Sequence, residues 1–168
     1  VPAHPAAQGL LRAFGGPLAA PSANPSGRIS PTTAAHVLAG LDGRIDAVVD
    51  GGSCALGLES TIVRCGTAPA LLRAGGIPSE ALEACLGMPL LQDVDADSPS
   101  APGQLASHYA PVGAVRLNVV QANPDETLLG FGDVDAALNL SPRGDLVQAA
   151  ARLFDCLHQL DAIGAAKI

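Results

Sequence analysis

The chain has 168 residues, of which 48% are hydrophobic but only 2% aromatic, so its core must be built from aliphatic side chains; with 15% charged residues it cannot be disordered throughout. Nine Lys and Arg against sixteen Asp and Glu give a net charge of −7, which argues against direct nucleic-acid binding because phosphate backbones require clustered cations. No apolar run approaches the roughly 20 residues needed to span a bilayer, so no membrane partner is expected.

The first predicted elements follow from apolar spacing and from residues that begin or end helices. Apolar positions over 5–14 have helical spacing, and the Gly-Gly-Pro that follows ends this helix. A second helix is expected to run to about Leu41, with Ser30 as N-cap and Pro31 in its first turn. Apolar runs bounded by glycines predict strands at 45–49, 60–65 and 70–73, and a further helix is predicted at 78–86.

The later part of the chain also alternates strands with a helix. Strands are predicted at 114–120 and 127–132, with a short one at 137–140. Asp145 is the expected cap of a helix whose apolar stripe consists of Leu146, Ala150, Leu153, Leu157 and Leu160. A βαβ unit needs one more parallel strand after this helix, and we expect the chain to stop before supplying it. The mixture predicts an α/β protein.

A polar stretch divides the chain into two predicted units. From Gln92 to Pro102 the sequence is rich in Asp, Ser and Pro, a composition typical of a solvated linker. The sequence therefore predicts one unit over 1–91, a linker over 92–111 and a second unit over 112–168.

The cysteines and the chain ends indicate the cellular context. Four cysteines without any C-x-x-C pair, and without a secretory signal, predict reduced, mostly buried thiols in a cytoplasmic protein. The chain starts Val-Pro-Ala-His-Pro without Met and ends where a strand could begin. We therefore expect a fragment that lacks both ends of a longer protein.

The densest group of polar residues is the loop over 20–32. Ser22 and Asn24 point the same way if this segment is extended, and Gly27 allows a ligand to approach the backbone. A phosphate would be stabilised by the free N–H groups at the predicted helix start near Ser30. The alternative is an ordinary loop, since the same residue types are common in turns.

Four motifs in fixed order resemble the YrdC-like domain of threonylcarbamoyl-AMP synthases. They are P-x-H-P at 2–5, A-P-S-A-N-x-S-G-x-x-S-P-T at 20–32, D-G-G-x-C-x-x-G-x-E-S-T-I-V at 50–63 and L-L-R-x-G-G-I at 71–77. The stretch from Ser98 to Pro111, ending S-H-Y-A-P, resembles the interdomain linker of the long members. The resemblance implies part of a YrdC-like domain, with a twisted mixed sheet and helices, followed by an incomplete Rossmann-like domain.

The resemblance also implies a reaction. Threonine takes up bicarbonate or CO₂, and the carbamate attacks the α-phosphate of ATP to give threonylcarbamoyl-AMP and pyrophosphate. The parent protein would be a nucleotidyltransferase of tRNA processing that hands its product to a partner transferase. No protein-held metal is predicted, because no His and Cys cluster has zinc spacing; Mg²⁺ would arrive with ATP.

Positions that match the family motifs take on implied roles. The resemblance places Ser22 and Ser60 on threonine, and Asn24, Thr32 and Arg73 on ATP. Hydroxyl and amide groups suit a small zwitterion and phosphate oxygens, and a guanidinium neutralises phosphate charge. For each of them the alternative is a purely structural role in a turn, a helix start or a strand.

The His108–Tyr109 pair follows the linker and is implied to form a lid over bound nucleotide. Tyr109 could instead anchor the linker by burying its ring. The family usually carries basic and aromatic residues before this pair, whereas this chain has Gln-Leu-Ala-Ser at 104–107. Glu59 is open between a surface carboxylate and an internal partner for an arginine.

The remaining histidines have no predicted role in the reaction. His4 could cap a helix, while His36 and His158 are expected to be isolated, satisfied groups. The family places a K-x-R pair and further threonine contacts in a portion that would precede Val1. The 168 residues alone are therefore expected to be inactive.

Two other functions are open at this stage. One is the carbamoyl-transferring hydrogenase-maturation protein, which contains a related domain and is disfavoured by the His-Tyr-Ala-Pro motif. The other is a non-catalytic RNA-binding module, which the net charge of −7 disfavours.

Overall fold

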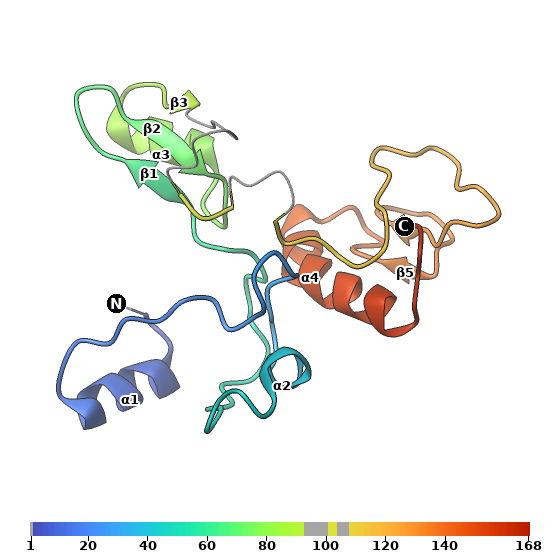
Figure 1. The fold of residues 1–168 in the computed structure, drawn as a ribbon. Helices are drawn as coiled ribbons and strands as arrows, with labels where there is room; N and C mark the ends of the chain where they lie inside the picture. The colour runs from blue at the N-terminus through green and yellow to red at the C-terminus, as the bar shows by residue number, and fades with distance from the viewer. Residues whose placement is uncertain (1, 93–100, 104–107) are drawn as a thin grey trace.

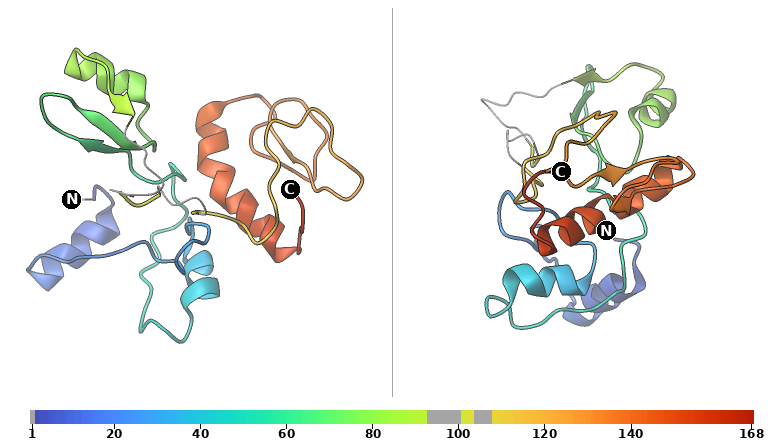
Figure 2. Two further views of the ribbon diagram at one scale, coloured as in Figure 1. Left: turned by 45° about the horizontal axis from the view of Figure 1, so that its top comes forward. Right: turned by 90° about the vertical axis from the view of Figure 1, so that its right-hand side faces the viewer.

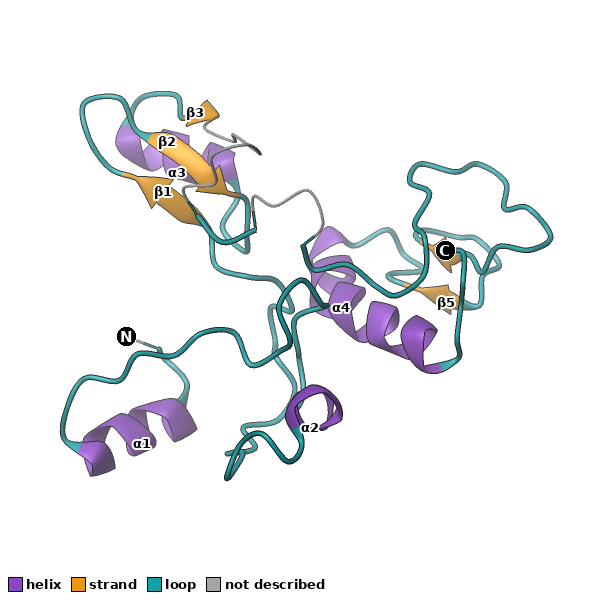
Figure 3. Cartoon of the chain, viewed as in Figure 1, coloured by secondary structure: helices purple, strands orange, loops and turns teal. Residues whose placement is uncertain are grey.

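The computed structural model describes residues 2–92, 101–103 and 108–168, and most of the predicted linker, 93–100 and 104–107, lies outside them. Helices and strands are joined by long loops. The three-stranded sheet and the long C-terminal helix lie on opposite sides of the molecule (Figure 1, Figure 3). The elements in chain order are α1 (Pro5–Phe14), α2 (Ala34–Leu41), β1 (Ile62–Arg64), β2 (Ala70–Arg73), α3 (Ser79–Leu86), β3 (Leu91–Gln92), β4 (Leu129–Gly130), β5 (Leu138–Asn139) and α4 (Leu146–Ala162). The predicted α/β class is confirmed.

Helix α1 has the predicted bounds. The His4 ring is its N-cap, with Nδ1 accepting a hydrogen bond of 3.3 Å from the Ala6 N–H, and Gly15 ends it at φ 73°. No residue of α1 is buried, and the Phe14 side chain is 60% exposed. The helix is therefore fixed by its caps more than by tertiary packing.

Helix α2 begins later than predicted. Its N-cap is Thr33, at φ −140° and ψ 161°, and the Thr33 hydroxyl accepts from the His36 N–H at 3.2 Å. The Ser30 hydroxyl, predicted to cap the helix, instead donates to the Glu59 carboxylate. The prediction of Ser30 as N-cap was wrong because a partner 29 residues away takes its hydroxyl.

A three-stranded sheet follows, in the order β1-β2-β3. Strands β1 and β2 are antiparallel, with a register shift between Ile62 and Val63, while β2 and β3 are parallel. Helix α3 has the predicted C-terminal end at Leu86, closed by Gly87 at φ 70°. The strand predicted at 45–49 is wrong: these residues form no ladder, and the side chain of Val49 is exposed.

The C-terminal unit contains the parallel pair β4-β5 and the long helix α4, whose N-cap is Asp145 as predicted. The strand predicted at 114–120 is wrong, since the structure shows only a parallel bridge between Ala114 and Lys167. Residues 163–168, after α4, form this bridge and no strand. Ile168 donates to the Ala114 carbonyl, and Arg116 donates to the Ile168 carbonyl, so the chain end pairs beside 114–116.

One buried cluster joins the two units. Ile29, from the polar loop of the first unit, packs with Phe154, Leu157 and Leu160 of α4. Leu146, predicted on the same stripe, is 75% exposed. The first turn of α4 thus extends beyond the cluster, and the predicted stripe is wrong at that position.

Burial outside this cluster is sparse. The accessible surface of 11024 Å² exceeds the roughly 7,600 Å² that size scaling gives for a compact monomer of 16.7 kDa. All four cysteines are free, but only Cys156 is buried, so the prediction of mostly buried thiols was wrong. Cys54, Cys65 and Cys85 are exposed.

Candidate functional site

A pocket of about 340 Å³ lies where the polar loop meets the start of α2. Ser22 and Thr32 line it on the loop side, and Glu59 lines it from the segment before β1. Thr33 and Ala34 bring the N-terminal end of α2 to the same wall. The pocket thus combines hydroxyl groups, one carboxylate and the positive end of a helix dipole.

Glu59 links this pocket to Arg73. Its Oε1 accepts a hydrogen bond of 2.5 Å from the Ser30 hydroxyl, and its Oε2 lies 3.9 Å from Nη2 of Arg73. The side chain of Arg73 is 12% exposed and that of Glu59 is 27% exposed. Of the two alternatives from the sequence, Glu59 is therefore the internal partner of an arginine.

Arg73 gathers two of the predicted site residues. Its Nε donates to the Ser60 carbonyl and its Nη2 donates to the Ser60 hydroxyl, both at 2.9 Å. Its Nη1 donates to the Tyr109 hydroxyl, also at 2.9 Å. Because a guanidinium has a fixed planar fork, these bonds set its direction.

Asn24 is turned toward its own loop. Its Nδ2 donates to the carbonyls of Pro25 at 3.0 Å and Arg28 at 3.1 Å, which closes the turn that contains Gly27 at φ 80°. Its Oδ1 is buried without a hydrogen-bond partner among the described residues. Asn24 is not among the residues that line the 340 Å³ pocket, whereas Ser22 and Thr32 are.

His108 and Tyr109 lie between the two units. Their rings meet edge to face with centroids 4.2 Å apart, and the Tyr109 ring lies 5.9 Å from that of Phe154. Tyr109 has φ 55°, a left-handed conformation that non-glycine residues seldom adopt. Its ring anchors the segment on α4 while its hydroxyl reaches Arg73.

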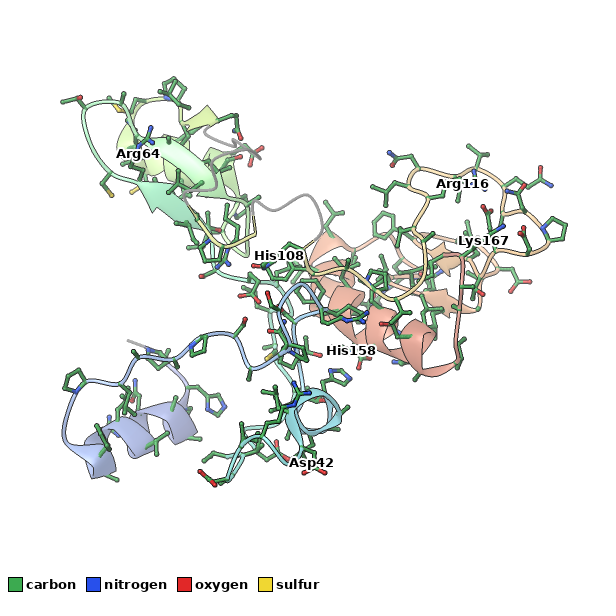
Figure 4. All side chains as sticks on the ribbon, in the orientation of Figure 1. Asp42, Arg64, His108, Arg116, His158 and Lys167 are labelled. Carbon is green, nitrogen blue, oxygen red and sulfur yellow. The ribbon has the colours of Figure 1, made fainter. Side chains whose placement is uncertain are left out.

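His36 and His158 are not isolated, contrary to the prediction. Their rings stack with centroids 3.9 Å apart and planes 23° apart, at the place where α4 approaches α2 (Figure 2, Figure 4). His36 Nε2 lies 3.5 Å from Asp155 Oδ1. Burial, followed by the adjacent His158, lowers the pKa of His36, and Asp155 acts in the opposite direction.

The described residues contain no group of three or more His, Cys, Asp or Glu side chains that could hold a metal ion. None of the helices they form is long and apolar enough to cross a bilayer.

Sequence reasoning missed the contacts that connect the site. The sequence predicts Ser30 as a helix cap, and His36 and His158 as isolated, satisfied groups. The Ser-Pro-Thr motif contains Ser30, but nothing local to it indicates a bond to Glu59. The two histidines are 122 positions apart, so no spacing rule could have paired them.

The fold and the site define an α/β protein with a small pocket, lined by both polar and apolar side chains, beside an arginine held by hydrogen bonds. A family model described as "Telomere recombination" matches residues 1–75, and one described as "Threonylcarbamoyl-AMP synthase, C-terminal domain" matches residues 77–168. The chain belongs to the threonylcarbamoyl-AMP synthase family, which confirms the resemblance.

Curated relatives agree with this membership. The chain is 37% identical to the threonylcarbamoyl-AMP synthase of Bacillus subtilis and 34% identical to that of Pyrococcus abyssi. These alignments cover 96% and 98% of the chain but 53% and 55% of the relatives. The chain therefore spans about half the length of the curated relatives it matches.

Solved structures are similar in fold over nearly the whole chain. P. abyssi Sua5 complexed with L-threonine matches with a TM-score of 0.83 at 32% identity, covering 99% of the chain and 56% of that protein. A P. abyssi Sua5 variant in which a His and the following Tyr are replaced by Ala matches with a TM-score of 0.81 at 31% identity, covering 99% and 55%. The division at 1–91, 92–111 and 112–168 stays a prediction; the two family models meet at 75–77.

Proposed function

We propose that the protein containing this chain makes L-threonylcarbamoyl-AMP from threonine, bicarbonate or CO₂, and ATP, for threonylcarbamoyladenosine modification of tRNA. The observation that carries the proposal is the pocket in which Ser22, Thr32 and Glu59 meet, with Arg73 held against Glu59. Family membership and the likeness to a Sua5 complexed with L-threonine support it.

The roles of the site residues follow from their chemistry. Ser22 and Ser60 bind threonine through their hydroxyls, and Asn24, Thr32 and Arg73 contact ATP. Ser60 and Tyr109 accept from three of the five N–H donors of Arg73, which leaves two N–H groups. Those two can reach a phosphate oxygen.

Asn24, like Ser60 and Arg73, does not line the pocket, and unlike them it is bonded only within its own loop. Its buried Oδ1 has no partner among the described residues, although a buried polar atom without one is costly. An adenine amino group, or a water beside the nucleotide, would satisfy this acceptor. Asn24 would then hold the loop through Nδ2 and contact ATP through Oδ1.

Tyr109 and His108 form a lid in this proposal. The positive φ of Tyr109 and its bond to Arg73 place the segment directly beside the arginine that contacts ATP. The nucleotide takes the two remaining Arg73 donors, and the Tyr109 side chain, still bonded to the same guanidinium, covers it. The lid thereby excludes water from the reacting phosphate.

The reaction needs positioning more than a covalent intermediate. The threonine nitrogen forms a bond to the carbon of CO₂ and loses a proton, which gives a carbamate. A carbamate oxygen then bonds to the α-phosphorus of ATP, and the bond from that phosphorus to the bridging oxygen breaks, releasing pyrophosphate. Arg73 and the N-terminus of α2 stabilise the developing negative charge.

Further parts of the proposal concern partners and location. Mg²⁺ enters as part of the ATP substrate, held by phosphate oxygens and waters. The product passes to a tRNA-modifying transferase. The free cysteines of the chain suit a cytoplasmic protein.

Pyrophosphate release by the complete protein tests the proposal. Release that requires threonine, bicarbonate and ATP together is the expected result. Omission of threonine or bicarbonate should each reduce release to background, and serine in place of threonine serves as the control substrate. Release that does not depend on threonine would contradict the proposed function.

A further inference from the structure

Helix α4 of the C-terminal unit reaches the pocket segment of the first unit. His158 lies at the contact, labelled in Figure 4, with its Nε2 3.1 Å from the Ser30 carbonyl oxygen. A carbonyl oxygen can only accept, so Nε2 carries a proton and donates. The bond joins positions 128 residues apart.

The His36 ring extends this contact to Thr32. Its Nδ1 lies 3.3 Å from both the backbone nitrogen and the hydroxyl of Thr32. Because the Thr32 N–H donates, Nδ1 is unprotonated and the proton of the neutral ring is on Nε2, which faces Asp155. The His158 ring stacks on this ring, so one side chain of α4 supports both Ser30 and His36.

These contacts reach residues that line the pocket, although Ser30 and His36 do not line it themselves. Thr32 is 5% exposed and lines it, and its carbonyl accepts from the Cys54 N–H at 2.9 Å. Ser30 is 4% exposed, and its hydroxyl donates to the Glu59 carboxylate that lines the pocket and faces Arg73. A shift of Ser30 would therefore move Glu59, and through it Arg73.

We propose that His158 is a positioning residue for the ligand pocket: its Nε2–H holds the Ser30 carbonyl, and α4 thereby fixes the 30–32 segment that binds the substrates. The inference rests on the proposed function for the identity of those substrates. It gives the C-terminal unit a role in binding, although none of its helices or strands lines the 340 Å³ pocket.

Two substitutions separate the hydrogen bond from the ring. His158→Phe keeps an aromatic ring against His36 and removes the donor. His158→Gln removes the ring and keeps an N–H donor at about the position of Nε2. Val147→Ala, on the exposed first turn of the same helix, is the matched control.

Calorimetry with L-threonine on the complete protein measures the effect on the pocket. His158→Phe should weaken threonine binding about fivefold, the loss expected for one net hydrogen bond, while His158→Gln and Val147→Ala remain within about twofold of the wild type. Thermal unfolding of each variant shows that it is folded. Equal binding by wild type and His158→Phe would overturn the inference, as would equal weakening in the Phe and Gln variants.

Hydrogen exchange of the amides at 29–33 gives a second measurement without ligand. Exchange should rise in His158→Phe and stay at the wild-type rate in His158→Gln. If the wild type fails to bind threonine while exchange follows this pattern, the proposed function is wrong and the positioning role stands. If threonine binds and exchange is the same in all variants, the positioning role is wrong and the proposed function stands.

Discussion

The guanidinium of Arg73 donates a hydrogen bond of 2.9 Å to the hydroxyl of Tyr109, which lies 36 positions later in the chain. The same guanidinium holds Ser60 through two further bonds. Strand β2, the segment before β1 and the segment that enters the C-terminal unit therefore meet at one cation. Because Tyr109 also packs on Phe154, this contact connects the site to the core around α4.

Removing the Arg73 guanidinium should free the Tyr109 side chain from its hydrogen bond. Arg73→Lys keeps the charge but cannot reproduce three directed bonds, so we expect Tyr109 to become more accessible. Tyr109 is the only tyrosine in the chain, which has no tryptophan, so acrylamide quenching of tyrosine emission reports on it alone. Quenching should increase in Arg73→Lys and be unchanged in Arg143→Lys, an exposed control. Unchanged quenching in both would show that the bond does not hold the ring.

Asn24 should affect ATP use more than folding. Asn24→Ala removes the bonds to the Pro25 and Arg28 carbonyls and the buried Oδ1, and each lost hydrogen bond costs about 1 kcal/mol. In the complete protein we expect the KM for ATP to rise about tenfold or more while the far-ultraviolet spectrum stays the same. Unchanged turnover at low ATP concentration would refute the assigned role.

His36 should make stability depend on pH. Its pKa is lowered in the folded chain, so the unfolded chain binds more protons below the ordinary value of 6.5. The folding stability linked to His36 is fully present above pH 6.5 and is lost as the pH falls from 6.5 toward the lowered pKa of His36. Urea unfolding at pH 7.5, 6.5 and 5.5 should show a smaller loss of stability on acidification in His36→Gln than in the wild type. An equal loss in both would contradict the prediction.

Glu126 should titrate unusually low because of Arg116. Bonds of 2.8 Å from Nε and 2.5 Å from Nη2 of Arg116 lower the pKa of Glu126 to about 2. Arg116→Gln should return it toward 4.5, as measured by carboxyl carbon NMR titration. Any stability from this pair is present above 4.5 and lost as the pH falls toward 2.

Lys167→Gln is the control for that titration. Lys167 pairs with Asp125 and lowers the pKa of that carboxyl, so its removal should raise the pKa of Asp125. The pKa of Glu126 should stay low in this variant. A shift of Glu126 in both variants would show that general charge, rather than the Arg116 bonds, sets its titration.

Leu160 and Leu146 should differ sharply although the same apolar stripe predicted both. Leu160 is fully buried, so Leu160→Ala should lower the free energy of unfolding by about 2 to 5 kcal/mol. Leu146→Ala, on the exposed first turn, should change it by less than about 0.5 kcal/mol. Urea denaturation of the two variants compares them directly, and similar losses would contradict the burial seen here.

Local chemistry explains why some elements were predictable. The bounds of α1, the Gly87 end of α3 and the Asp145 cap depend on residues within a few positions of each other. The predicted start of α2 was wrong because the Ser30 hydroxyl has a distant partner. The predicted strand at 114–120 was wrong because a ladder needs a second strand in the right register.

The α/β class and most helix ends follow from the amino-acid sequence, and its ordered motifs identify the family and the set of residues proposed for the site. Three contacts are visible only in the folded chain: Glu59 joins Ser30 to Arg73, Tyr109 reaches Arg73, and His158 of α4 contacts the Ser30 carbonyl. The difference lies in how far apart the interacting groups are in the sequence. Caps and turns are satisfied by neighbours in the chain, whereas these contacts join groups 14 to 128 positions apart and form only when the folded chain brings their segments together.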